Sequence, residues 1–164
     1  VKESLRMRPD RVVVGEIRDG YAAMDMLQAM NTGHEGSMGT VHANSPRDCF
    51  TRIDGMVAIA GMKIDQQAVY SQVASALDLI VYQTRMRDGS RAVTHIVEIT
   101  GMEGSVISMQ DIFVRPAHAE GASDPLRPAG LIPNCYQKII DSGQTIDRGM
   151  FLLADEVGSA NRWR

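Results

Sequence analysis

A glutamate near the start of the chain stands out as a candidate catalytic residue, with an arginine two positions after it. Glu16 follows an unbroken apolar run, Val12–Val14, and such a run is typical of a strand buried on both faces of a parallel sheet. Ligands of open α/β sheets sit beyond the carboxyl ends of the strands, where Glu16 would emerge. A carboxylate there can hold a metal ion through water or orient an attacking water as a general base. Two alternatives stay open: Glu16 only caps the next helix, or it pairs with Arg18, which could clamp a phosphate or form an ordinary surface ion pair.

His34 and His42 belong to a glycine-rich cluster whose backbone can come close to a ligand. The stretch Ser37–His42 is predicted to be a second strand, on which Thr40 and His42 point the same way because side chains alternate. A strand ending in His beside one ending in Glu would bring an acid–base pair to one sheet edge. A buried histidine in a tight turn explains the same pattern. A zinc site fits poorly, because no third His or Cys stands at ligand spacing.

The elements that must position these residues follow a βαβ pattern. Asp19 and Ser45 are expected to cap two amphipathic helices that end near Gly33 and Gly61, and a third helix is expected over 65–77. From residue 78 onward, apolar and polar residues alternate with a period of two, as in β-strands. This change predicts a three-stranded antiparallel meander over 79–85, 91–100 and 106–114, with an Asp-Gly turn between its first two strands. The fold class is therefore α/β.

Composition narrows the possible classes of protein. The chain has 164 residues and a net charge of −3, so it lacks the basic face that a nucleic-acid partner would require. No apolar run approaches the roughly 18 residues of a membrane span. Cys49 and Cys135 lie far apart in no metal or redox motif, which favours a cytoplasmic setting. We expect one main domain over 1–115, a linker or loop over 116–133 that is rich in proline, and a short helical appendage over 134–164.

Two segments of the chain resemble the type II/type IV secretion traffic ATPases. The Walker B box of that superfamily is similar to LRMRPDRVVVGEIRD, and its histidine box is similar to NTGHEGSMGTVHANSP. Within the superfamily, the CpaF-like ATPases that assemble tight-adherence (Flp) pili are similar to SALDLIVYQTRMRDGSRAVTHIVEITGMEG followed by ISMQDIFV. The similarity runs through most of Val1–Val114. It implies the C-terminal part of a RecA-like ATPase domain in a cytoplasmic, homohexameric ring that works on an inner-membrane platform of a pilus or secretion system.

The resemblance also implies roles for individual residues. Glu16 would be the Walker B glutamate, which contacts Mg²⁺ through water and activates the attacking water. His42 would reach the γ-phosphate of ATP. Arg18, His34 and Thr40 would be nucleotide-binding residues. ATP hydrolysis would then drive the movement of pilin or another substrate.

One departure from the family pattern limits this expectation. The P-loop, G-x-x-x-x-G-K-[ST], which cradles phosphates, appears nowhere in the sequence. We therefore expect a C-terminal portion of a motor that is inactive alone. The alternative from another class is a non-catalytic module for ring assembly or interaction in a pilus or secretion machine. A self-contained hydrolase using Glu16 and His42 is disfavoured, because no nucleophile motif accompanies them.

Overall fold

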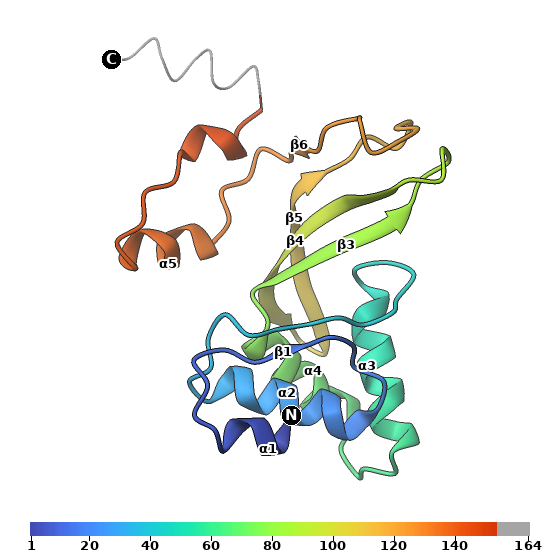
Figure 1. Cartoon of the computed structure of the whole chain (residues 1–164), viewed down its shortest axis with the longest axis vertical. Coiled ribbons are helices and arrows are strands. Elements are labelled where there is room, and N and C mark those ends of the chain that lie inside the picture. Colours follow the sequence, from blue (N-terminus) through green and yellow to red (C-terminus); the bar gives the residue numbers. More distant parts are fainter. Residues whose placement is uncertain (154–164) are drawn as a thin grey trace. The chain divides into compact units, whose positions relative to one another are not determined.

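The computed structural model describes residues 1–153 as a mixed α/β fold, and the chain divides into two compact units (Figure 1). Among the described residues, the first unit comprises 1–78 and 101–108, and the second comprises 79–100 and 109–153. In chain order the elements are α1 (Lys2–Leu5), β1 (Val13–Val14), α2 (Gly20–Asn31), β2 (Met38–Gly39), α3 (Asp48–Ile59), α4 (Gln66–Ala76), β3 (Leu79–Arg85), β4 (Arg91–Glu103), β5 (Val106–Val114), β6 (Arg127–Pro128), α5 (Cys135–Asp141) and the 3-10 helix η1 (Arg148–Phe151).

Helices α2, α3 and α4 pack together to form the core of the first unit. Asp19 caps α2 as predicted, since its Oδ1 accepts a hydrogen bond from the Ala22 N–H at 2.8 Å. The first residue of α2 is a glycine because α3 approaches it closely. A Cβ on Gly20 would lie 2.5 Å from the Met56 carbonyl oxygen, so a larger residue would push the two helices apart. The buried apolar residues of these helices are Ala23, Met26, Leu27, Ala29, Phe50, Ile53, Met56, Val57, Val69 and Val73.

The predicted start of α3 was two residues too early. The α-helix begins at Asp48 rather than directly after Ser45. The Ser45 hydroxyl still accepts a hydrogen bond from the Asp48 N–H at 3.1 Å, so it stabilises the turn that leads into the helix. Gly61 follows the end of α3 with φ +71°, in the left-handed region that glycine adopts at low cost.

Strands β1 and β2 form a two-stranded parallel sheet in which Val13 pairs with Met38 and Val14 pairs with Gly39. The prediction of a strand buried on both faces was wrong for this part of the chain. The side chain of Val12 is buried, whereas 68% of Val13 and 59% of its partner Met38 are exposed. The reason is that a two-stranded sheet has few neighbours, and nothing in the described residues covers this face.

The predicted antiparallel meander is confirmed, and a fourth strand extends it in the order β3-β4-β5-β6 (Figure 1). β3 and β4 pair in antiparallel fashion around the turn at Gly89, which has φ +86°. β4 is longer than predicted: the strand was expected to end at Thr100, and it continues to Glu103. β6, which lies inside the range expected to be a linker, pairs antiparallel with the end of β5.

The C-terminal segment returns to this sheet within the second unit. The predicted helix over 134–142 is observed as α5, but the second predicted helix, over 146–155, is observed only as the 3-10 helix η1. Ala154, Asp155 and the expected frayed end at 158–164 lie outside the described residues. The buried ring of Phe151 packs edge-to-face with Tyr136 and at a tilt against Phe113, with centroid distances of 6.0 and 5.7 Å. Across residues 1–153, no helix has both the length and the apolar character needed to traverse a lipid bilayer.

Candidate active site

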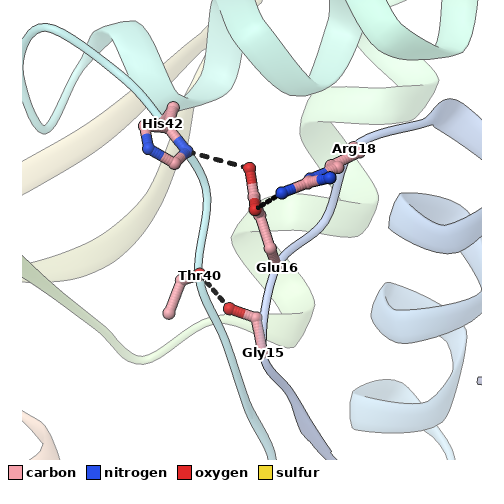
Figure 2. A network of polar contacts seen from close by, with 5 residues as sticks. All are labelled: Gly15, Glu16, Arg18, Thr40 and His42. Carbon is pink, nitrogen blue, oxygen red and sulfur yellow. Dashed lines mark hydrogen bonds and ion pairs between the residues drawn. The ribbon is translucent and has the colours of Figure 1, made fainter.

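The candidate site lies just beyond the carboxyl ends of β1 and β2, where the two strands run in the same direction (Figure 2). Glu16 follows β1 by two residues, and His42 follows β2 by three. Their side chains point toward each other, and the His42 Nδ1 lies 3.1 Å from the Glu16 Oε1. The acid–base pair that the sequence suggested is therefore brought together. Because parallel neighbouring strands end at one edge, residues 26 positions apart meet there.

Arg18 approaches the other oxygen of the same carboxylate. Its Nη2 donates a hydrogen bond to the Glu16 Oε2 at 2.5 Å. This hydrogen bond is the largest cause that lowers the pKa of Glu16. Burial opposes it, and the charge of Arg18 and the charge and hydrogen bond of His42 add smaller lowering effects. The Arg18 pKa is raised in return. Glu16 is thus held as a carboxylate, which suits it to orient water more than to store a proton.

The depressed pKa of Glu16 gives a direct test of this contact. In Arg18→Gln we expect the pKa of Glu16 to rise toward its usual range, because the largest cause of the shift is removed. The measurement is a ¹³C NMR pH titration of the Glu16 carboxyl. In the folded chain this pKa lies below its unfolded value, so the contact adds stability at neutral pH and loses it as the pH falls through the folded pKa. Arg6→Gln, which removes a cation paired with Glu3, is the matched control. An unchanged Glu16 titration in Arg18→Gln would contradict the assignment.

Thr40 reaches the site through the backbone. Its hydroxyl donates to the Gly15 carbonyl at 2.5 Å, and its own carbonyl accepts from the Ile17 N–H at 2.9 Å. Figure 2 shows the Thr40 side chain directed at Gly15, beside the Glu16–His42 contact. The sequence signal for this proximity was the alternation expected of a strand over 37–42, but that strand is observed only as Met38–Gly39, so Thr40 and His42 lie just beyond its end. The identity of the partner carbonyl could not be read from that signal.

His34 is not part of this network. Its Nδ1 lies 3.3 Å from the Ala29 carbonyl oxygen near the end of α2, and its own carbonyl accepts from the Ser37 hydroxyl at 2.7 Å. The Ser37 oxygen also accepts from the Val12 N–H at 2.9 Å. These contacts tie the glycine-rich loop to β1. The structure therefore places Glu16, Arg18, Thr40 and His42 together, with His34 in the loop that leads to β2.

The donor set limits how a metal ion could be held. Within residues 1–153, no group of three or more His, Cys, Asp or Glu side chains is placed to bind a metal ion. Glu16 offers a single carboxylate at the strand edge. This fits Mg²⁺, which keeps several waters and is commonly held by one or two carboxylates together with substrate phosphates. It does not fit a closed zinc site, which needs four protein ligands.

A comparison with protein families identifies the family of this chain. Residues 1–122 match the family described as type II/IV secretion system protein. The chain belongs to this family. The matched range contains the whole candidate site and the β3–β4–β5 meander.

Individual relatives come from bacterial transfer and secretion systems. A Mycobacterium tuberculosis protein named for conjugal transfer is 44% identical over 106 residues, which are 65% of this chain and 29% of that protein. The conjugal transfer protein TrbB of Rhizobium radiobacter is 39% identical over 101 residues, which are 62% of this chain and 29% of that protein. The chain thus spans less than a third of the length of these relatives.

A solved structure supports the same family placement. The crystal structure of the VirB11 ATPase from the Brucella suis type IV secretion system, in complex with sulphate, aligns with a TM-score of 0.52 at 26% identity. The alignment covers 58% of this chain and 30% of VirB11. The mixed α/β fold is therefore shared with an ATPase of a secretion system. The comparisons do not extend to the finer similarity with CpaF-like proteins.

Proposed function

We propose that this chain supplies the water-activating side of an ATP-hydrolysing site in a secretion or pilus-assembly motor. The observation that carries the proposal is the 3.1 Å contact between Glu16 and His42 at the shared end of two parallel strands. Family membership over residues 1–122 supports it, as does the likeness to an ATPase. In this proposal the stretch around Glu16 is the Walker B box, and the stretch 31–46 is the histidine box.

The chemistry proposed for these residues is positioning and charge stabilisation, which supply most of the catalysis in phosphoryl transfer. Glu16 accepts one bond on each oxygen from Arg18 and His42, and each oxygen keeps a lone pair that can orient a water. His42 is 84% exposed, and with both ring nitrogens protonated it can donate Nδ1–H to Glu16 and Nε2–H to a phosphate oxygen. Glu16 would hold Mg²⁺ through water, and the bound ion would neutralise phosphate charge. Arg18 and His34 are proposed to bind nucleotide.

The wider setting of the site is part of the same proposal. We take the domain to be the C-terminal part of a RecA-like fold that acts in a homohexameric ring, with ATP bound between subunits. The ring would lie in the cytoplasm, peripheral to the inner membrane, and would drive a pilus or secretion platform, closest to the CpaF-like machines of Flp pili. Since the chain has no P-loop motif, it would hydrolyse ATP only together with the phosphate-binding part of the protein.

Replacement of His42 tests this proposal in the full-length protein. We expect His42→Ala to lower kcat for ATP about tenfold. This is less than the 10²- to 10³-fold typical of a donor in a water-excluded oxyanion site, because His42 is largely exposed to water. The measurement is steady-state phosphate release at saturating ATP and Mg²⁺. His118→Ala, which alters an exposed histidine in the second unit, is the control and should leave kcat unchanged. If His42→Ala hydrolysed ATP at the wild-type rate, the proposed role of His42 in catalysis would be wrong.

A further inference from the structure

We infer that Thr40 is a positioning residue that acts on Glu16 through the backbone, in place of the direct nucleotide contact expected for it. The inference rests on the proposed function, because it assigns a task to Glu16. It goes beyond that function by naming the group that sets the geometry of the carboxylate relative to His42. The evidence is the set of hydrogen bonds that surrounds Glu16 (Figure 2).

Thr40 forms hydrogen bonds to the backbone on both sides of Glu16. The Thr40 N–H donates to the Val14 carbonyl at 3.3 Å, and the Thr40 hydroxyl donates to the Gly15 carbonyl at 2.5 Å. On the far side, the Ile17 N–H donates to the Thr40 carbonyl at 2.9 Å. The strand ladder itself ends earlier, at the pair of Val14 with Gly39. The hydroxyl bond therefore extends the pairing of the two segments into the loop that carries the carboxylate.

The same residue also fixes the partner side of the site. Thr40 precedes His42 by two positions, so holding Thr40 against Gly15 sets the distance between the two segments where His42 meets Glu16. Arg18 and His42 occupy the two carboxylate oxygens but are 78% and 84% exposed, and exposed ion pairs hold geometry weakly. Thr40 is exposed as well, but its three hydrogen bonds join backbone segments, which have less conformational freedom than the long side chain of Arg18, so Thr40 is the firmer constraint on where the carboxylate lies.

The chemistry of a hydroxyl argues against a simultaneous phosphate contact. A threonine hydroxyl has one proton to donate, and here that proton is directed at the Gly15 carbonyl. Phosphate oxygens of ATP at neutral pH only accept hydrogen bonds. Thr40 would have to break its bond to Gly15 before it could donate to a phosphate, so the two roles exclude each other.

The test compares five variants of the full-length protein in steady-state ATP hydrolysis and in equilibrium ATP binding. Thr40→Val keeps the branched shape and removes the hydroxyl, and we expect kcat to fall about tenfold while the Kd for ATP stays within about threefold. Thr40→Ser restores the hydroxyl and should recover most of kcat. Thr32→Val is the matched control, because the Thr32 hydroxyl also donates to a backbone carbonyl, that of Gln28, but at the end of α2. It should leave kcat unchanged. The last two variants are Glu16→Gln alone and Glu16→Gln combined with Thr40→Val.

Each outcome separates the inference from the function on which it rests. If Thr40 acts through Glu16, Thr40→Val should cause no further loss of rate in the Glu16→Gln background, which a general structural defect would not reproduce. A raised Kd with unchanged kcat would make Thr40 a nucleotide ligand and overturn the inference, as would an unchanged kcat in Thr40→Val or a low kcat in Thr40→Ser. If Thr40→Val does not fold, the comparison of Thr40→Ser with the wild-type protein still tests the inference. A wild-type rate in Glu16→Gln alone would instead overturn the proposed function.

Discussion

Glu16→Gln in the full-length protein is expected to lower kcat for ATP about 10³-fold, in the middle of the range that a positioned acid–base group contributes. Glutamine keeps the shape of the side chain but replaces one carboxylate oxygen with an amide group that cannot accept a hydrogen bond. The charge that pairs with Arg18 and His42 is lost as well. ATP should still bind with a Kd within about threefold of wild type, because Glu16 acts on the attacking water rather than on the bound nucleotide.

The measurements are single-turnover hydrolysis for the chemical step and equilibrium binding of a fluorescent ATP analogue for affinity. Glu35→Gln is the matched control: the residue lies in the same stretch of the chain, is exposed, and is not among the residues that meet at the site. It should hydrolyse ATP at the wild-type rate. A kcat for Glu16→Gln within a few-fold of wild type would show that another group activates the water.

Glu98→Ala is expected to have the largest effect on stability, and it acts away from the site. The side chain is only 2% exposed, and its carboxylate accepts three hydrogen bonds. The donors are the Gln110 amide at 2.8 Å, the Asn134 N–H at 2.9 Å and the Cys135 N–H at 2.7 Å. The last two belong to the start of α5, so Glu98 fastens the C-terminal segment to β4. Alanine would leave these donors without their acceptor and would open a cavity, at a cost of about 2–3 kcal/mol.

The effect should be visible in native-state hydrogen exchange of the Cys135 amide. A loss of 2–3 kcal/mol corresponds to roughly 30- to 150-fold faster exchange at this amide. Glu98→Gln should lose less but still a measurable part, because all three partners are donors and one amide half cannot accept. Glu103→Ala, an exposed glutamate at the end of the same strand, is the control and should stay within about 0.5 kcal/mol. Unchanged Cys135 protection in Glu98→Ala would show that other contacts hold α5.

Features that depend on neighbours in the chain were predicted well. The Asp19 cap of α2, the apolar stripes of α2, α3 and α4, and the Asp-Gly hairpin of the meander are determined by residues within a few positions of each other. Strand β6 was missed because its two residues, Arg127 and Pro128, carry no strand signal. They become a strand only through pairing with Val114 and Phe113 of β5. The exposure of Val13 was missed for a related reason, because burial depends on which elements cover a strand.

The buried role of Glu98 also lay outside the reach of sequence patterns. In the sequence it is one polar residue of an alternating strand, where solvent exposure is the ordinary expectation. Its burial follows from α5, which begins 37 residues later and brings two backbone N–H groups to the carboxylate. The pattern of polar and apolar residues around Glu98 does not indicate partners that lie this far away in the sequence.

The sequence by itself determined which residues are candidates for chemistry, where most helices and strands lie, and which family the two boxes resemble. Tertiary structure decided which of those candidates meet. The parallel pairing of β1 with β2 brings His42 to Glu16, ties Thr40 to Gly15 and leaves His34 against the end of α2. The physical reason is that strand pairing fixes the register between segments about 25 residues apart, and register is a property of the folded sheet rather than of either segment.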